Sequence, residues 1–191
     1  MISFKARIKG FLGEKLLGVL SFLFLKNNEV IVKNDIVIPA YDKITKAYTG
    51  TTQIDQIVIS KYGIFVIEIK TYKGWIFGSK KASKWTQVLY KIKNSFQNPL
   101  HQNYKHIKSL KNITGISESK FISVIVFWGA VFKTQMPENV LQGMDYINYI
   151  KSFKKVILTE EEIKHIIKII YDNSLPNSAH RKYIKNYHKK V

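Results

Sequence analysis

Cysteine is absent from the 191 residues of this chain. Without cysteine, the protein can form no disulfide, no zinc site built on thiolates and no cysteine nucleophile. The absence fits a reducing compartment, and we expect a cytoplasmic location.

Acidic residues are also scarce, since 13 Asp and Glu stand against 31 Lys and Arg and give a formal net charge of +18. A charge of this size and sign favours a polyanionic partner, which is DNA, RNA or an anionic membrane surface. The alternative is that the lysines reflect only the amino-acid usage of an AT-rich genome. The positions of the charges along the chain help to decide.

The segment between Glu68 and Glu118 contains no acidic residue. The lysines in it or at its edge are Lys70, Lys73, Lys80, Lys81, Lys84, Lys91, Lys93, Lys105, Lys108 and Lys111. The aromatic residues interleaved with them are Tyr72, Trp75, Phe77, Trp85, Tyr90, Phe96 and Tyr104. Lysines bind phosphates and exposed rings stack on bases, although most of these rings are expected in the core. We interpret the segment as a nucleic-acid interface.

Long hydrophobic runs are missing as well. The most apolar stretch, FLGEKLLGVLSFLFL at residues 11–25, has an uninterrupted apolar part of about ten residues. A helix that spans a bilayer needs roughly 20. We therefore expect a buried helix here, no membrane span, and no secretory signal.

The apolar periodicity predicts an α/β fold with a mixed sheet flanked by helices. The expected elements are a helix over 4–26, extended chain over 29–38 ended by Pro39, a hairpin over 53–70, a short strand over 75–77, a helix from Asn98-Pro99 to about Gly115, a buried strand over 121–128 and a helix over 160–172. The Asn-Pro pair and the capping box at Thr159 mark the helix starts. The helix after Asn98 places Leu100, Tyr104, Ile107 and Leu110 on one apolar stripe.

We expect a single domain over residues 1–175, with its core at about 10–130 and C-terminal helical additions. Residues 176–191 follow as a basic tail, HRKYIKNYHKKV at its end, with no acidic residue. Such a tail is either solvated or touches nucleic acid, and we expect the former.

The hairpin QIDQIVISKYGIFVIEIK carries two carboxylates at its centre, Asp55 and Glu68. A loop of two or four residues places them directly opposite each other, whereas three residues without a bulge would place Asp55 opposite Ile69. Opposed like charges repel, and a hard cation such as Mg²⁺ turns the repulsion into attraction. The alternative is that both acids lie on a solvated face and pair with Lys70, which shares the face of Glu68.

Several motifs come in an order that resembles a known family. They are Gly13-Glu14, Thr52-Gln53-Ile54-Asp55, Gly63-Ile64-Phe65-Val66-Ile67-Glu68-Ile69-Lys70, Gly74, Trp85, Asn98-Pro99 and Gln102. Together, over about residues 10–130, they resemble the nuclease-related domain (NERD) family of PD-(D/E)XK, restriction-endonuclease-like nucleases. Ile54 stands where the superfamily name has proline.

This resemblance implies a restriction-endonuclease-like αβββαβ core, dependence on Mg²⁺ (with Mn²⁺ as a substitute) and cleavage of DNA. It also implies that Asp55 and Glu68 are metal ligands, that Lys70 is the catalytic lysine and that Glu14 is an acidic helper. No small-molecule cofactor is expected, and the oligomeric state stays open, a homodimer included.

The residues expected to contact nucleic acid are Gln53, Lys73, Lys80, Lys81, Lys84, Gln102 and His106. Gln102 and His106 are four residues apart on one helix edge, where Gln102 could reach a phosphate or order the metal site and His106, on the surface, could contact the backbone. An alternative function is a nucleic-acid-binding module that keeps the fold but cleaves little, and membrane-surface association ranks last. The intact set of Asp55, Glu68 and Lys70 favours the nuclease.

Overall fold

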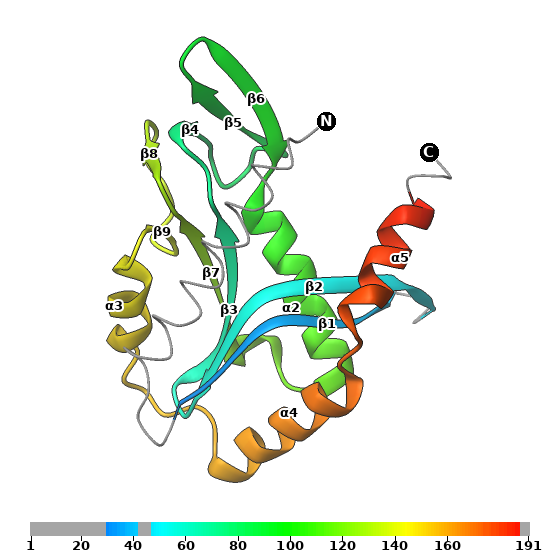
Figure 1. The fold of residues 1–191 in the computed structure, drawn as a ribbon. Coiled ribbons are helices and arrows are strands. Elements are labelled where there is room, and N and C mark those ends of the chain that lie inside the picture. Colours follow the sequence, from blue (N-terminus) through cyan, green and yellow to red (C-terminus); the bar gives the residue numbers. More distant parts are fainter. Residues whose placement is uncertain (1–29, 42–46, 188–191) are drawn as a thin grey trace.

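The computed structural model, which describes residues 30–41 and 47–187, is built around two β-sheets (Figure 1). A five-stranded sheet has the order β1-β2-β3-β7-β9, and a four-stranded sheet has the order β6-β5-β4-β8. The strands are β1 (Ile31–Tyr41), β2 (Tyr48–Ser60), β3 (Gly63–Lys70), β4 (Gly74–Phe77), β5 (Lys84–Leu89), β6 (Ile92–Gln97), β7 (Phe121–Phe127), β8 (Ala130–Phe132) and β9 (Val140–Gln142). The helices are α2 (Pro99–Thr114), η1 (Glu118–Lys120), α3 (Asp145–Ser152), α4 (Glu160–Asn173) and α5 (Asn177–Tyr187).

The predicted mixed α/β fold is confirmed. Strands β1, β2 and β3 are antiparallel, whereas β7 runs parallel to β3 and β9 runs parallel to β7. The β2–β3 hairpin has the two-residue loop Lys61-Tyr62, closed by the pair Ser60 and Gly63. The helix expected over residues 4–26, with Glu14, lies outside the described residues.

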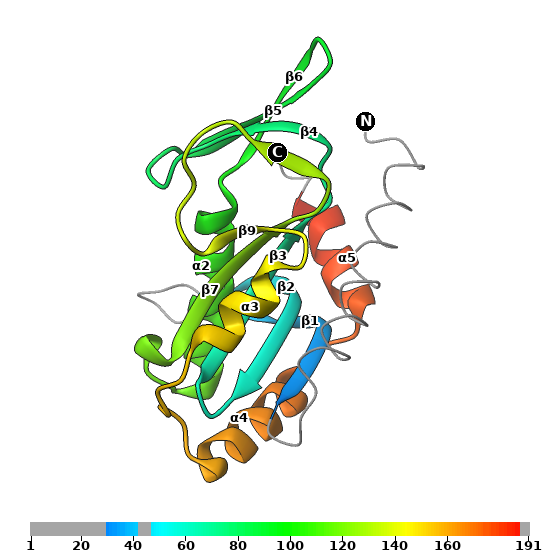
Figure 2. The same ribbon diagram turned by 90° about the vertical axis from the view of Figure 1, so that its left-hand side faces the viewer.

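Helices cover both faces of the large sheet (Figures 1 and 2). On one face, Ile107 and Leu110 of α2 and Ile166 of α4 pack against isoleucines of β1, β2 and β3. On the other face, Tyr146 and Ile147 of α3 pack against Phe65, Ile67 and Ile69 of β3. Because side chains alternate along a strand, the even-numbered residues of β3 point toward α2. This alternation directs Glu68 and Lys70 to the α2 side.

The two sheets meet beyond the carboxyl ends of β3 and β7. After Lys70, three residues separate β3 from β4, and after Phe127, two residues separate β7 from β8. The Trp128 amide donates to the Lys70 carbonyl at 2.8 Å across this break. Since β4 and β8 are again parallel neighbours, the small sheet extends the large one past the end where Glu68 and Lys70 lie. The strand over 75–77 was predicted, but β5 and β6 were not.

The start and end of α2 lie where the sequence placed them. The Asn98 side chain accepts a hydrogen bond from the Leu100 amide, and Gly115 ends the helix at φ +69°. Of the predicted apolar stripe, Ile107 and Leu110 are buried and Leu100 is partly buried, but Tyr104 is 48% exposed. Asn103 and His106 are buried instead. The Asn103 amide donates to the Val66 carbonyl and the Ser123 hydroxyl, so a polar side chain joins α2 to β3 and β7.

Two other features differ from the expectation. Pro39 does not end β1, which continues to Tyr41, because β1 is an edge strand and tolerates a missing amide donor. The segment expected as a solvated tail forms α5 over residues 177–187. Helix α5 packs on β2 where Gly50, at φ +135°, leaves room for the ring of Tyr183. A Cβ at residue 50 would overlap that ring, at 2.1 Å.

Within the described ranges, no helix has both the length and the apolar character that crossing a bilayer requires.

Replacing Asn98 by Ala tests how strongly the start of α2 holds the loop before β5. Asn98 is fully buried, and besides capping α2 it donates to the carbonyl of Ala82 at 2.7 Å. We expect Asn98→Ala to lower the free energy of unfolding by about 3 kcal/mol, because a cap and a buried hydrogen bond are lost together. Thr159→Ala, at the exposed capping box of α4, is the matched control and should cost about 1 kcal/mol. Equal losses in urea denaturation would contradict the dual role of Asn98.

Candidate active site

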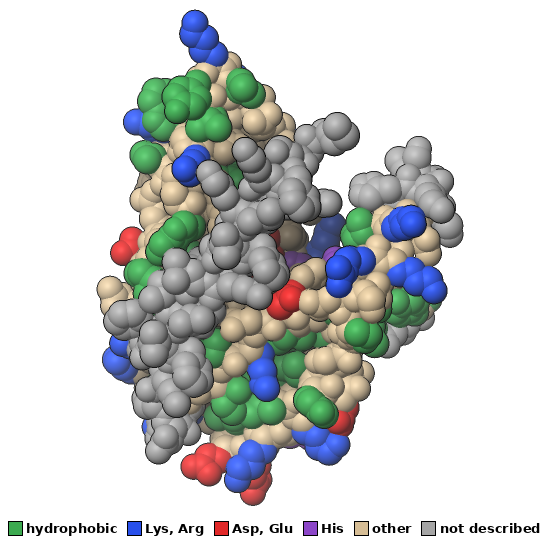
Figure 3. Space-filling view, viewed as in Figure 1, with side chains coloured by type: hydrophobic (Ala, Val, Ile, Leu, Met, Phe, Trp, Pro, Cys, Tyr) green, Lys and Arg blue, Asp and Glu red, His purple; other side chains and the backbone are tan. Residues whose placement is uncertain are grey.

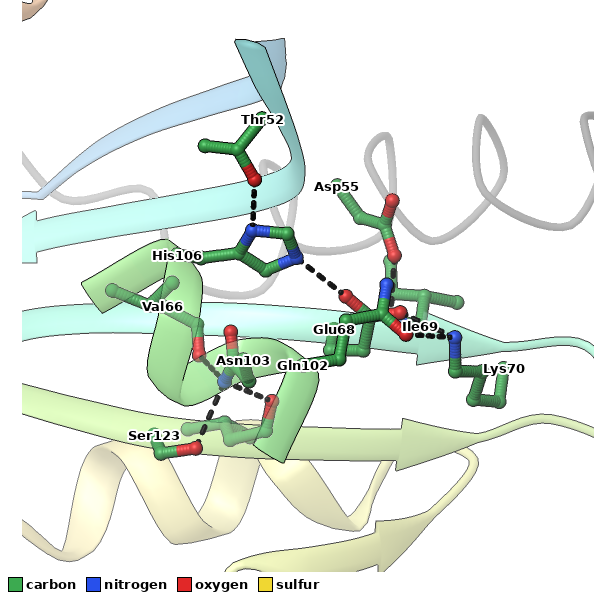
Figure 4. A network of polar contacts seen from close by, with 11 residues as sticks. Thr52, Asp55, Val66, Glu68, Ile69, Lys70, Gln102, Asn103, His106 and Ser123 are labelled. Atoms are coloured by element: carbon green, nitrogen blue, oxygen red, sulfur yellow. Dashed lines mark hydrogen bonds and ion pairs between the residues drawn. The ribbon is translucent and has the colours of Figure 1, made fainter. Parts of the chain in front are cut away.

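A buried carboxylate lies at the carboxyl end of β3. The side chain of Glu68 is 2% exposed, and it points from the sheet toward α2. Its Oε1 accepts a hydrogen bond from Lys70 Nζ at 2.5 Å, and its Oε2 lies 3.1 Å from His106 Nε2 (Figure 4). Each carboxylate oxygen therefore has one nitrogen partner, which is the Lys70 ammonium for Oε1 and the His106 ring for Oε2.

His106 connects Glu68 to β2. Its Nδ1 lies 2.6 Å from the Thr52 hydroxyl, on the side of the ring away from Glu68 (Figure 4). An ionised carboxylate only accepts hydrogen bonds, so Nε2 must donate to Glu68. In the neutral ring Nδ1 is then an acceptor, and the Thr52 hydroxyl donates to it. This chain, from Thr52 through His106 to Glu68, holds both the imidazole and the carboxylate in one orientation.

Glu68 stays ionised in spite of its burial. Burial alone would raise the pKa of this carboxyl group, but the hydrogen bond with His106 and the charge of Lys70 outweigh it, and the net effect holds the pKa below its ordinary value. The converse holds for Lys70, where burial opposes the charge and the Glu68 carboxylate raises the pKa above its ordinary value. The pair is thus a charged one at neutral pH.

Lys70 is held from two elements. Besides Glu68, its ammonium donates to Gln102 Oε1 of α2 at 3.0 Å. Asp55 also contributes to the raised pKa of Lys70, so its carboxylate lies within electrostatic reach of the ammonium. The Lys70 side chain is 16% exposed, and its ammonium, fixed by two acceptors, can present its remaining proton in one defined direction.

Asp55 comes to this end of the hairpin from β2. The paired register runs to Gln56 and Ile67, so Asp55 and Glu68 are the next opposed residues. At that point the strands are no longer joined by a backbone ladder, and Asp55 Oδ2 instead accepts the Ile69 amide at 2.7 Å (Figure 4). The two-residue loop thus gives the register that the sequence favoured, and the aspartate side chain replaces the next step of the ladder.

Of the predicted residues, the structure brings Asp55, Glu68, Lys70 and Gln102 together. Gln53 lies elsewhere, with its amide donating to Asp35 of β1. The predicted phosphate-binding lysines are exposed on the small sheet and the segments that flank its strands, and they are Lys73, Lys80, Lys81 and Lys84. Glu14 lies outside the described residues.

The prediction that His106 is a surface residue which contacts a nucleic-acid backbone was wrong. Its side chain is 6% exposed, and both ring nitrogens have partners inside the protein. The spacing of four from Gln102 correctly placed both residues along one edge of α2, but that edge faces β2 and β3. The His106 imidazole therefore contacts Glu68 inside the protein and does not face solvent.

Two further contacts were not found from the sequence. Thr52 was noticed only as part of a motif, and nothing in its neighbourhood signals a hydrogen bond to a histidine 54 positions away. Next to it, the Thr51 hydroxyl lies 2.9 Å from His180 Nδ1 of α5. This contact brings α5 to the edge of the site, where burial and the nearby His106 lower the pKa of His180. A contact over 129 positions has no local sequence signal.

The molecular surface is hollowed near this cluster. Figure 3 shows a hollow beside α5, with histidine and basic side chains inside it. Within the described part of the chain, no three His, Asp or Glu residues gather into a group that could hold a metal ion. A metal at this site would therefore have only two carboxylates from the described residues, those of Asp55 and Glu68.

Comparison with known proteins adds an independent line of argument. The nuclease-related domain family matches residues 9–128. This range includes the whole cluster, which is Thr52, Asp55, Glu68, Lys70, Gln102 and His106. An uncharacterized protein of Bacillus anthracis is 40% identical over 149 residues, which cover 75% of this chain and 70% of that protein. No solved structure gives a significant match.

Glu68→Gln in metal-free buffer tests the buried ion pair. The substitution keeps the shape but removes the charge that compensates Lys70, so we expect a loss of about 2–3 kcal/mol in the free energy of unfolding at pH 7. Because folding lowers the pKa of Glu68 below its ordinary 4.5, its contribution is complete above that pH and is lost as the pH falls through the folded-state value. The variant should therefore lose less stability than the wild type on acidification below about 4.5.

Asp172→Asn is the matched control, since Asp172 pairs with Lys168 on the exposed face of α4. It should change the free energy of unfolding by less than about 0.5 kcal/mol. Equal stability of Glu68→Gln and wild type at pH 7 would show that the buried pair contributes nothing.

Proposed function

This chain belongs to the nuclease-related domain family, of the restriction-endonuclease-like superfamily, and we propose that it is a metal-dependent nuclease that hydrolyses phosphodiester bonds of DNA. The family relation suggests a nuclease-related function and an interaction with nucleic acid. The observation that carries the finer proposal is the cluster at the end of β2 and β3, in which an ionised Glu68, a charged Lys70 and Asp55 lie together.

The residues present fit a divalent cation. Carboxylate oxygens are the ligands that Mg²⁺ prefers, and Mn²⁺ accepts the same donors. Among the described residues, each Glu68 oxygen has one protein hydrogen bond, and a carboxylate offers about four lone-pair positions, so acceptor capacity remains for an ion. Mg²⁺ usually keeps several water ligands, which suits a site with two protein carboxylates. Asp55 and Glu68 would hold the cation.

A bound cation would neutralise charge on a phosphate and activate water as a nucleophile. The chain's own residues supply the rest. Lys70 brings a fixed positive charge that stabilises the negative charge growing on the phosphate, or orients the attacking water. Gln102 holds that ammonium, and His106 with Thr52 holds the carboxylate of Glu68. Glu14, as an acidic helper, completes the proposal.

DNA would reach the site over basic surfaces on two sides. The small sheet and its flanking segments carry the exposed lysines Lys73, Lys80, Lys81 and Lys84. Helix α5 carries Arg181, Lys182 and Lys185, all exposed, and its His180 bonds to Thr51 at the edge of the cluster. The hollow in Figure 3 lies beside α5. Phosphates attracted to both would bring a strand across Asp55 and Glu68.

Asp55→Asn separates chemistry from folding. An asparagine oxygen can still accept the Ile69 amide, so the fold should remain, while the charge that binds metal is lost. With circular and linear DNA in Mg²⁺ or Mn²⁺, we expect cleavage by the wild type, none in EDTA, and a rate at least about 100-fold lower for the variant. Calorimetry with Mn²⁺ should show weaker binding to Asp55→Asn than to Asp172→Asn, the control on α4. DNA binding without cleavage in either metal would reject the nuclease and favour a binding module.

The basic surface of the small sheet predicts a steep salt dependence of DNA affinity. If Lys73, Lys80, Lys81 and Lys84 each contact one phosphate of duplex DNA, these four contacts should contribute about −4 to the slope of log K against log salt, at roughly −0.9 per contact. Replacing Lys80, Lys81 and Lys84 together by Ala should reduce its magnitude by about 3 and leave Mn²⁺ binding unchanged. Ala at Lys151, Lys154 and Lys155, around the end of α3, removes the same charge and should leave the slope nearly as it is. A wild-type slope near zero would refute the nucleic-acid role of these lysines.

A further inference from the structure

The β5–β6 hairpin projects from the small sheet and forms the uppermost part of the molecule in Figure 1. The pair Leu89 and Ile92 closes a two-residue loop, Tyr90-Lys91, at its tip. Tyr90 is 93% exposed and Ile92 is 62% exposed. A large aromatic side chain at the tip of a projecting hairpin makes almost no contribution to the core, so burial does not explain why it is there.

The backbone of the loop does not explain the tyrosine either. Tyr90 has φ +55°, in the left-handed region that favours Gly or Asn at the first position of such a loop. A β-carbon makes that conformation costly, and such outliers concentrate where a function selects them. Neither packing in the core nor the geometry of the turn accounts for a tyrosine at this position. We therefore look for its role in a contact with another molecule.

The charges around the tip indicate what that molecule is. Residues 74–97, which form β4, β5 and β6, contain no acidic residue, and Lys91 and Lys93 flank Ile92. On the same sheet, Trp75 is 50% exposed, and Lys133 Nζ lies 4.7 Å from the centre of its ring. Figure 3 shows hydrophobic and lysine side chains side by side on this projecting part. Aromatic rings among lysines are the combination that binds single-stranded nucleic acids.

We propose that the tip of the β5–β6 hairpin binds unpaired nucleotides, with Tyr90 stacked on a base and Lys91 and Lys93 near the adjacent phosphates. This inference rests on the proposed nuclease function and narrows its substrate to DNA that contains a single-stranded part. A ring needs an open base face to stack on, which unpaired bases offer and the interior of a duplex does not.

The path from the hairpin to the site supports this assignment. Strand β5 runs antiparallel to β4, and Val88 pairs with Trp75. The tip of the hairpin therefore lies next to the start of β4, which follows Lys70 after three residues. A strand of DNA that leaves the site along the start of β4 would meet the tip within a few nucleotides.

The test measures binding of labelled oligonucleotides by fluorescence anisotropy in EDTA, so that no cleavage occurs. The probes are oligo-dT of 20 nucleotides and a blunt duplex of 20 base pairs. Tyr90→Asn removes the ring and suits the left-handed backbone, so the melting temperature should stay within about 2 °C of the wild type or rise. The same variant should bind the single strand about 5- to 100-fold more weakly, since the loss of stacking on one base weakens binding by about that factor.

Three comparisons separate stacking from charge and from folding. Tyr90→Phe keeps the ring and should bind as the wild type does. Tyr171→Asn removes a tyrosine that is 77% exposed on α4 and should change nothing. Because Tyr90→Asn removes no charge, its salt slope should equal that of the wild type, and its duplex affinity should change by less than about 2-fold.

A wild-type preference for the single strand that Tyr90→Asn abolishes would support the proposal. Unchanged single-strand binding by that variant, with DNA cleavage intact, would overturn the hairpin's role and leave the nuclease in place. Absence of DNA binding in the wild type would overturn both. Binding to vesicles of phosphatidylserine and phosphatidylcholine that depends on Tyr90, with no such dependence for oligo-dT, would assign the tip to a membrane and reject our proposal.

Discussion

The ionised carboxylate of Glu68, whose side chain is 2% exposed between β3 and α2, determines which side chains must surround it and where they must lie. A buried charge is costly unless it is paired and hydrogen-bonded, so its neighbours must supply donors at fixed positions. Lys70 does so from the same strand and His106 from α2, while Thr52 of β2 fixes the imidazole. Three elements thus meet in one orientation, and the face of α2 that packs here is polar where an ordinary core helix would be apolar.

The break between the two sheets has a functional consequence. It comes directly after Lys70, so the small sheet projects past the end of the strands that carry the carboxylates. A surface with exposed lysines and exposed rings therefore begins where the acidic cluster ends. Helix α5 approaches the same cluster from the other side through His180 and Thr51. Basic side chains thus border the site on two sides, on the small sheet and on α5.

Charges of opposite sign have separate roles in this arrangement. The many lysines create a field that attracts a polyanion over distances of about a Debye length, roughly 8–10 Å at physiological salt. The two acids of the hairpin interact at short range: Glu68 is buried and hydrogen-bonded to Lys70 and His106, and the partly buried Asp55 accepts the Ile69 amide. A scarce residue type in a basic chain is thus informative where it is placed inside an apolar hairpin.

The sequence by itself determined the local features. The Asn98-Pro99 start of α2, the capping box of α4 and the buried strand β7 follow from short-range propensity and hydrophobic pattern. For the hairpin, the sequence favoured the opposition of Asp55 and Glu68 but left the loop length open, and the structure shows a loop of two residues. Only the tertiary structure decided that His106 is buried against Glu68, that Gln102 holds Lys70 and that α5 docks on Gly50. Each of these is a contact between residues far apart in sequence, and a polar residue buried by a long-range partner has the same local pattern as one on the surface. The periodicity of α2 could place His106 and Gln102 on one edge, but the partner of that edge depends on how the helix packs against the sheet.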